Sequence, residues 1–161
     1  MTSPQYDATC SFDSPVGNIN LFAQDEKVVF LTMGDEPVGD HGRAKVLKQA
    51  KSQLTDYFKG KSHTLDFAVE LSGTEFQKAV WAQIAKLGWG ETATYADIAQ
   101  AIGNPQAVRA VGGAVGANPV PLVVGCHRVL GASKKITGYS GGDGIPTKKW
   151  LLAHESIDYR D

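Results

Sequence analysis

Residues 118–129 read NPVPLVVGCHRV, an apolar approach that ends in a cysteine, a histidine and an arginine. Cys126 is adjacent in sequence to two side chains that can carry positive charge, and positive charge favours the thiolate, the nucleophilic form of cysteine. We therefore interpret Cys126 as a candidate nucleophile with a lowered thiol pKa. The alternative, a cysteine buried as a small inert hydrophobic side chain, stays open on these residues alone.

His127 is the nearest candidate base for this thiol. Neighbouring residues point to different sides of a strand or a helix, so direct proton transfer from Cys126 to His127 is awkward. We expect a bridging water to connect the two side chains.

Two short helices are predicted ahead of the cysteine. Thr94 with Asp97 forms a capping box that begins a helix stopped by Gly103. Asn104 can cap, and Pro105 can begin, another helix that runs to residue 116. Helices joined by such a short glycine-containing turn are typical of a helix-turn-helix, although antiparallel helix pairs also occur in proteins that never bind DNA.

Further elements surround this pair. A capping box of Thr74 and Gln77 predicts a helix that ends at Gly88. After the cysteine we expect a hairpin through residues 131–135 and a last helix over 147–154.

The first 72 residues show a different pattern. Residues 10–12, 19–23 and 28–31 predict three strands. A helix follows, because apolar residues recur at three- and four-residue steps between Ala44 and Phe58. We find no residues typical of catalysis here, so we divide the chain into a supporting α/β domain (1–72) and a mainly helical domain (73–161).

Composition limits the classes of protein that fit. With 42% hydrophobic and 20% charged residues among 161, the chain has an ordinary globular balance. Two cysteines exclude a disulfide framework and a four-cysteine zinc site, and no segment approaches the roughly 18 apolar residues of a membrane span. With no targeting segment recognised, we expect a cytoplasmic protein. Residues 73–161 hold 9 Lys/Arg against 7 Asp/Glu, a net +2 that permits DNA binding.

Several segments together carry a resemblance to a known family. They are GETATYADIA (90–99), GNPQAVRAVGGA (103–114), NPVPLVVGCHRV (118–129), TGYSGG (137–142) and WLLAHE (150–155). From about residue 73 to residue 155 the chain resembles the O6-alkylguanine-DNA alkyltransferase (methylated-DNA–protein-cysteine methyltransferase) family, whose members move an alkyl group from guanine onto their own cysteine. By the same resemblance, the first domain is ribonuclease H-like.

The resemblance implies roles for the residues around the thiol. Glu155 orients His127, the histidine polarises a water, and the water deprotonates Cys126. The amide of Asn118 ties the helix-turn-helix to the active-site loop. Tyr95 turns the neighbouring phosphate and donates a proton toward the departing base.

The resemblance also implies how damaged DNA is bound. Tyr139 and Ser140 match the loop that closes over the guanine, and the carbonyls of Cys126 and Val129 accept from its amino edge. A base must leave the duplex to expose its O6 atom. Arg109 matches the family residue that enters the space left by the departing base. The small residues Ala110, Gly112, Gly113 and Ala114 would let this helix enter the minor groove. Close helix packing would explain the glycines equally well.

Gly125 departs from the family pattern, which has proline before the cysteine. Glycine loosens the loop that aims the thiol, so we expect activity with a reduced rate or a changed tolerance for bulky adducts.

We therefore expect a single-turnover enzyme that repairs O6-alkylguanine, and by resemblance O4-alkylthymine, in duplex DNA without metal or cofactor. A monomer is expected, and cooperative binding on DNA is left open. Two rivals remain: a helix-turn-helix protein that binds lesions or operators without transfer, and a thiol hydrolase that uses Cys126, His127 and Glu155.

Overall fold

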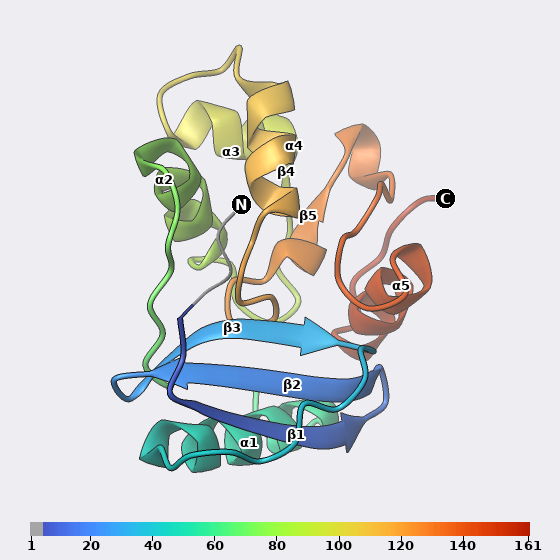
Figure 1. The fold of residues 1–161 in the computed structure, drawn as a ribbon. Coiled ribbons are helices and arrows are strands. Elements are labelled where there is room, and N and C mark those ends of the chain that lie inside the picture. The colour runs from blue at the N-terminus through green and yellow to red at the C-terminus, as the bar shows by residue number, and fades with distance from the viewer. Residues whose placement is uncertain (1–4) are drawn as a thin grey trace.

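The computed structural model describes residues 5–161, which form a small sheet with one helix and a second, mainly helical part (Figure 1). The sheet contains three antiparallel strands in the order β1 (Ala8–Ser14), β2 (Gly17–Gln24) and β3 (Lys27–Met33). The three strands predicted from the sequence are confirmed, and each is longer than predicted.

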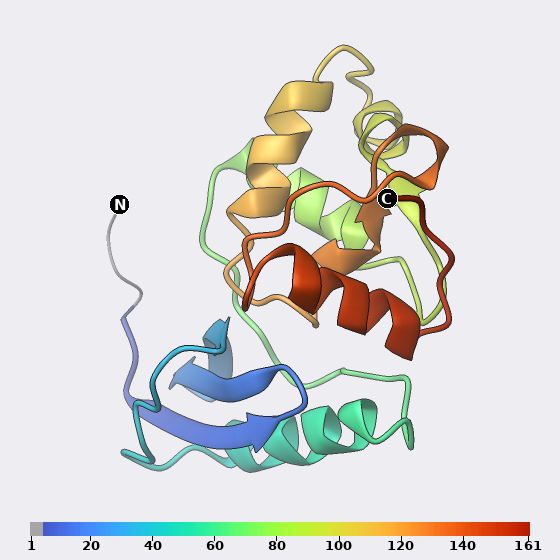
Figure 2. The ribbon, with the colours of Figure 1, turned by 90° about the vertical axis from the view of Figure 1, so that its right-hand side faces the viewer.

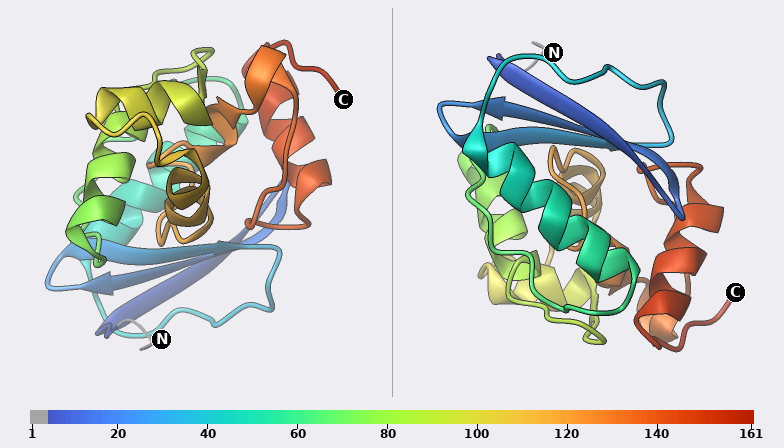
Figure 3. Two further views of the ribbon diagram at one scale, coloured as in Figure 1. Left: turned by 90° about the horizontal axis from the view of Figure 1, so that it is seen from above. Right: turned by 90° about the horizontal axis from the view of Figure 1, so that it is seen from below.

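Helix α1 (Lys45–Phe58) lies against this sheet (Figure 3). Its apolar side chains form one stripe because they recur with the helical period. The buried members of the stripe are Val46, Leu47, Ala50, Leu54, Tyr57 and Phe58. The predicted helix is confirmed, and Gly60 at φ +73° follows it as the expected breaker.

The second part is built from short elements. They are α2 (Glu75–Ile84), β4 (Ala93–Thr94), α3 (Tyr95–Ala101), α4 (Val108–Gly116), the 3₁₀ turns η1 (Cys126–Arg128) and η2 (Ala132–Lys134), β5 (Val129–Leu130) and α5 (Ile145–His154). Both predicted capping boxes are present, at the start of α2 and at the start of α3.

Three predicted boundaries or pairings are wrong. Helix α4 begins at Val108 instead of Pro105, because the Ala107 N–H donates to the Asn104 carbonyl and closes a turn. Asn followed by Pro is also the signature of such a turn. Helix α2 ends at Ile84 instead of Gly88. The predicted hairpin around 131–135 does not form.

The Gly131 N–H donates to the Lys135 carbonyl and closes a turn, but the residues on its two sides pair with other parts of the chain. Strand β5 pairs in parallel with β4, so that Ala93 lies opposite Val129. Lys135 forms a bridge with Arg160 near the end of the chain. The segment after the cysteine is therefore held by distant parts of the chain, and the last helix begins at Ile145, two residues before the predicted start.

The outer edge of β3 connects the two parts of the molecule. Its Leu31 N–H donates to the Pro119 carbonyl at 3.0 Å, at the beginning of the apolar approach to Cys126. Val120, Leu122 and Leu151 of the second part belong to the same buried cluster as the sheet and α1. Helix α5 lies on the side of the helical part that faces the sheet (Figure 2). The apolar approach is thus packed directly against the sheet.

Among residues 5–161, no helix has both the length and the apolar character needed to cross a bilayer.

Candidate active site

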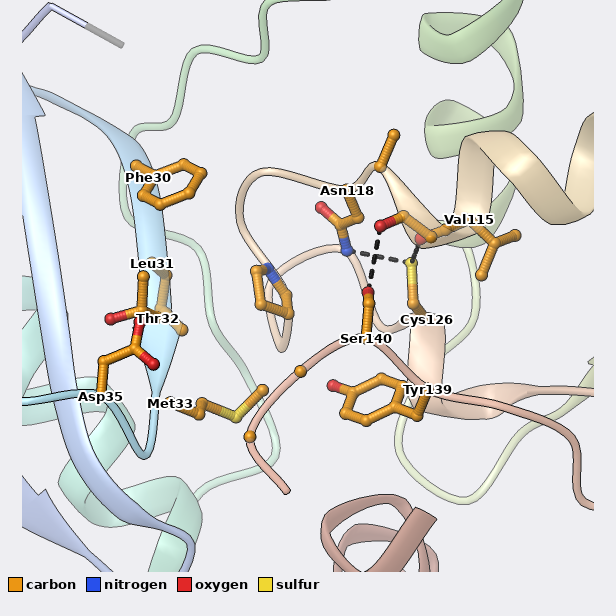
Figure 4. Close-up of a pocket in the computed structure, with 15 residues that line it drawn as sticks. Phe30, Leu31, Thr32, Met33, Asp35, Val115, Asn118, Cys126, Tyr139 and Ser140 are labelled. Carbon is orange, nitrogen blue, oxygen red and sulfur yellow. Dashed lines mark hydrogen bonds between the residues drawn. The ribbon is translucent and has the colours of Figure 1, made fainter. Parts of the chain in front are cut away.

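Cys126 begins the η1 turn, and its side chain is held by the end of α4 (Figure 4). The Asn118 side-chain amide donates to Cys126 Sγ at 2.9 Å and to the Val124 carbonyl at 2.8 Å. The Asn118 side-chain oxygen accepts from the Val120 N–H at 2.9 Å. The thiol itself lies 3.5 Å from the Val115 carbonyl of α4, to which it donates. Asn118 therefore connects the C-terminal end of α4 with the cysteine loop.

The prediction of a lowered thiol pKa is wrong for the resting protein. Cys126 is only 2% exposed, and burial raises the pKa of its thiol from 9.0 to about 12. The hydrogen bond from Asn118 and the charge of Lys148 oppose this shift without overcoming it. Cys126 is thus a protonated thiol at neutral pH, and a base must remove its proton before it can act as a nucleophile.

His127 and Glu155 form a buried pair behind the cysteine. His127 Nε2 lies 2.6 Å from Glu155 Oε2, and both side chains are 0% exposed. Burial lowers the pKa of His127, against the opposing effect of the Glu155 carboxylate, so the ring is held neutral. Because the carboxylate can only accept, Nε2 carries the proton and Nδ1 is the basic nitrogen. Nδ1 is buried and has no hydrogen-bond partner among residues 5–161.

Arg128 also turns toward Glu155. Its guanidinium donates from Nε to Oε1 at 2.8 Å and from Nη2 to Oε2 at 3.0 Å, and Nη1 donates to the Leu87 carbonyl. Burial opposes ionisation of Glu155, but hydrogen bonds from His127 and Arg128 outweigh it and hold the carboxyl pKa well below its usual range. No sequence motif indicates that His127 and Arg128 share one carboxylate.

Two residues outside the expected site complete the surroundings of Glu155. The Tyr57 hydroxyl of α1 donates to Oε2 at 2.6 Å, and the Gly90 N–H donates to Oε1 at 3.1 Å. Sequence reasoning missed Tyr57 because its spacing placed it in the apolar stripe of α1, where an aromatic ring needs no further explanation.

A cavity of about 310 Å³ contains the cysteine, and both parts of the molecule line it (Figure 4). Tyr139 and Ser140 form one wall, next to Cys126 and Asn118. The opposite wall comes from β3 and the bend that follows it: Phe30, Leu31, Thr32, Met33 and Asp35. Residues 1–72 therefore shape the site, although no candidate functional residue was predicted there.

A second cavity of about 320 Å³ lies on the α3 and α4 side of Tyr139 and Ser140. Tyr95 and Gly112 line it, and the Tyr95 hydroxyl lies 2.8 Å from Thr137 Oγ1. Ser140 Oγ donates to the Gly116 carbonyl at 3.0 Å. Four residues border both cavities: Val115, Gly116, Tyr139 and Ser140. The structure thus brings Tyr95 to the loop of Thr137, Tyr139 and Ser140, which also borders the cysteine cavity, but Tyr95 itself lines a different cavity from Cys126.

Val129 is buried, and its carbonyl already accepts from Lys148 Nζ at 2.7 Å. The Cys126 carbonyl likewise accepts from the Val129 N–H. A carbonyl oxygen has two lone pairs, so each retains one for another donor. Burial lowers the pKa of Lys148 to about 8. No motif in the sequence distinguishes this lysine from the others.

The residues of α4 that were predicted to face DNA differ in solvent exposure. Arg109, Ala110 and Gly113 are exposed, whereas Ala114 is 3% exposed and its side chain faces the core, so it is not part of the exposed face. A Cβ atom added at Gly112 or Gly113 would meet nothing within 4 Å. Close packing therefore does not explain these glycines, and the alternative of a binding requirement is favoured.

No group of three or more His, Cys, Asp or Glu side chains gathers within residues 5–161 in a way that could hold a metal ion.

Comparison with known proteins gives matches along nearly the whole chain. Residues 9–71 match the family "6-O-methylguanine DNA methyltransferase, ribonuclease-like domain", and residues 75–157 match "6-O-methylguanine DNA methyltransferase, DNA binding domain". A methylated-DNA–protein-cysteine methyltransferase of Mycolicibacterium paratuberculosis is 43% identical over 148 residues, covering 89% of this chain and 88% of the relative. A constitutive enzyme of the same name from Bacillus subtilis is 35% identical over 158 residues, covering 92% and 95%.

A solved structure agrees with these relatives. The Mycobacterium tuberculosis OGT in complex with DNA superposes with a TM-score of 0.82 and is 39% identical, with 92% of each chain covered.

Proposed function

This chain belongs to the 6-O-methylguanine DNA methyltransferase family, and from that premise we propose that it repairs DNA by moving the alkyl group of O6-alkylguanine onto Cys126. The observation that carries the assignment of the nucleophile is the position of Cys126. Its sulfur is held by Asn118 in a cavity lined by Tyr139 and Ser140, next to a histidine–glutamate pair.

The proposed transfer begins with loss of the thiol proton. Nδ1 of His127 accepts that proton through a bridging water, while Glu155 holds the opposite ring nitrogen. The sulfur then attacks the alkyl carbon, an S–C bond forms, and the bond between that carbon and O6 breaks. Guanine leaves with the electron pair of the broken bond and receives a proton from Tyr95, whose hydroxyl is available at the neighbouring cavity.

The damaged base is proposed to enter from the α3 and α4 side, after it has rotated out of the duplex. The cavity lined by Tyr95, Gly112 and Tyr139 has a volume that suits a base, since ligand pockets commonly begin at about 300 Å³. It shares Val115, Gly116, Tyr139 and Ser140 with the cysteine cavity, so we propose that the base enters here and reaches Cys126 past these shared residues. The remaining lone pairs on the Cys126 and Val129 carbonyls are then free to accept from the guanine amino group.

Helices α3 and α4 are proposed to act as the helix-turn-helix that contacts the minor groove. The support is the open space around the half-buried Gly112 and the exposed Gly113, since large side chains would exclude the helix from a groove about 6 Å wide. Arg109, exposed in the first turn of α4, is proposed to fill the space left by the base.

The division of labour follows the two family matches. We assign residues 73–161 to DNA binding and transfer, and residues 1–72 to a ribonuclease H-like domain that supports the site and forms one wall of the cysteine cavity. Because a thioether does not readily leave, each molecule acts once. From the family resemblance we also propose O4-alkylthymine as a secondary substrate. We propose a monomer that needs no cofactor.

Turnover separates this function from its two rivals. Purified protein is mixed with a molar excess of duplex carrying O6-methylguanine, and the restored guanine is counted over time. The proposed function predicts a burst that stops at one guanine per protein molecule. A lesion-binding protein restores none. A thiol hydrolase instead continues to release product from an ester or amide substrate beyond one equivalent.

A further inference from the structure

Tyr57 connects the first domain to the buried pair behind the nucleophile. It lies near the end of α1, 98 residues before Glu155, and its hydroxyl donates to Glu155 Oε2 at 2.6 Å. Tyr57 and Glu155 are each 1% exposed, so water does not compete for this hydrogen bond. The contact places a residue of the supporting domain in direct reach of the proton relay.

The ring of Tyr57 does not account for this hydroxyl. The ring packs edge-on against Phe58, Trp89 and His154, with centroid distances of 5.4, 5.4 and 5.2 Å. A phenylalanine ring would make the same contacts. Only the hydroxyl reaches Glu155, and burial together with the nearby carboxylate raises the pKa of the phenol, so it stays a donor at every working pH.

Glu155 Oε2 is shared between competing donors. It accepts from Tyr57, from His127 Nε2 at 2.6 Å and from Arg128 Nη2 at 3.0 Å, while Oε1 accepts from Arg128 Nε and Gly90 N. Each donor withdraws negative charge from the carboxylate and restricts its rotation. Removing the Tyr57 hydroxyl leaves Oε2 with two donors, so its remaining charge acts more strongly on the histidine.

We propose that Tyr57 is a positioning residue for alkyl transfer: its hydroxyl fixes the plane of the Glu155 carboxylate and limits the basicity that the carboxylate confers on His127. The part of this inference that concerns rate rests on the proposed function. The charged and titratable groups that bear on His127 are Glu155, Arg128 and Lys148, and those that bear on Glu155 include His127, Arg128 and Tyr57. Tyr57 is the member of this set that comes from α1.

The test uses the full chain with Tyr57→Phe, which keeps the ring and removes only the hydroxyl. The methyl-transfer rate constant is measured across pH, and the His127 ring is titrated by NMR in the same variant. We expect transfer about fivefold to tenfold slower at neutral pH. We also expect the His127 midpoint, and the pH at which the rate rises, to move upward.

Phe58→Leu is the matched control. Phe58 is the buried neighbour of Tyr57 on α1, and its side chain has no polar atom that could form a hydrogen bond with Glu155. This variant should lose stability while keeping the wild-type pH profile. A Tyr57→Phe protein with an unchanged His127 titration and an unchanged pH profile would overturn the inference, whatever its stability. If wild-type protein transfers no methyl group, the proposed function fails, but the NMR titration still decides the role of Tyr57.

A second comparison asks whether Tyr57 acts through Glu155. In a Glu155→Gln background, Tyr57→Phe should no longer move the His127 midpoint, because the shared acceptor charge is gone. A shift of the same size in both backgrounds would contradict the proposed route.

Discussion

At Cys126, burial outweighs the charged neighbours that the sequence places beside it. His127 and Arg128 follow the cysteine directly, yet both side chains turn to Glu155, 28 and 27 residues further on. The thiol is left with an amide donor, Asn118, and a pKa of about 12. A resting thiol of this kind avoids unspecific alkylation and becomes reactive only when a base is in place.

This account predicts how Cys126 titrates. In a Cys10→Ser variant, which removes the other cysteine, ultraviolet absorbance should show no thiolate below about pH 9, because burial raises the pKa of the Cys126 thiol toward 12. The raised pKa also means that folding stability falls as pH rises above 9.0, since the unfolded chain then releases the proton first. A thiolate step between pH 6 and 8 would contradict the buried, protonated thiol.

Gly125 gives a second prediction at this scale. Its φ of −73° suits proline, and its N–H makes no hydrogen bond within residues 5–161. A Cβ atom there would lie 3.0 Å from Arg128 Nη1 and 3.2 Å from Arg128 Cδ. Gly125→Pro and Gly125→Ala share this crowding, but only proline restricts the loop.

We therefore expect Gly125→Pro to transfer methyl groups faster than Gly125→Ala in single-turnover assays, because the restricted loop holds the thiol in its attacking position. Equal rates for the two variants would show that the flexibility of Gly125 does not limit the reaction.

At the scale of elements, substitutions at Gly113 on the surface of α4 distinguish an effect on folding stability from an effect on DNA binding. Gly113 is exposed, and an added Cβ would meet nothing. Gly113→Ala should raise the free energy of unfolding by about 1 kcal/mol, the difference in helix propensity between the two residues. Gly113→Leu should also stabilise the helix but weaken binding to duplex DNA, because its side chain would meet the groove walls.

Urea unfolding and fluorescence anisotropy with a labelled duplex measure the two effects in the same samples. If the leucine variant binds duplex as tightly as wild type, α4 is not the face that enters the groove.

Local sequence patterns predicted those elements whose causes are local. The capping boxes at Thr74 and Thr94 and the apolar period of α1 specify helices through contacts within four residues. Elements that depend on distant partners were missed. The pair of β4 and β5 joins residues 93–94 to 129–130, and no pattern near residue 129 encodes that partner.

The candidate site divides in the same way. Cys126, Asn118, Tyr139 and Ser140 were predicted from motifs, and they meet around one cavity. The missed groups are those whose side chains serve equally well as ordinary packing: the β3 wall, Lys148 and Tyr57. Their roles depend on where the first domain sits against the second, which a single sequence does not reveal.

At the scale of the whole molecule, the two parts share contacts that neither can make alone. Leu31 donates across the junction to the Pro119 carbonyl, and His154 Nε2 donates to the Tyr57 carbonyl at 2.7 Å. Apolar residues of the second part, including Leu122 and Leu151, complete the core of the first. Separating the parts would expose this apolar surface and leave buried polar groups unpaired.

The shared core predicts one cooperative unfolding transition. Tryptophan fluorescence and far-ultraviolet circular dichroism should give the same urea midpoint, since Trp81 and Trp150 pack against different clusters of a single folding unit. Two separate midpoints would show that the first domain folds independently of the active site.

Methyl transfer to Cys126 is visible in the mass of the peptide that contains this cysteine. The protein is incubated with an excess of duplex carrying O6-methylguanine, digested and examined by mass spectrometry alongside Cys126→Ser. The account predicts one added methyl group on the peptide containing Cys126, none on the peptide containing Cys10, and none in the serine variant. An unmodified Cys126 peptide with the lesion still present, or a methyl group carried by another residue, would contradict it.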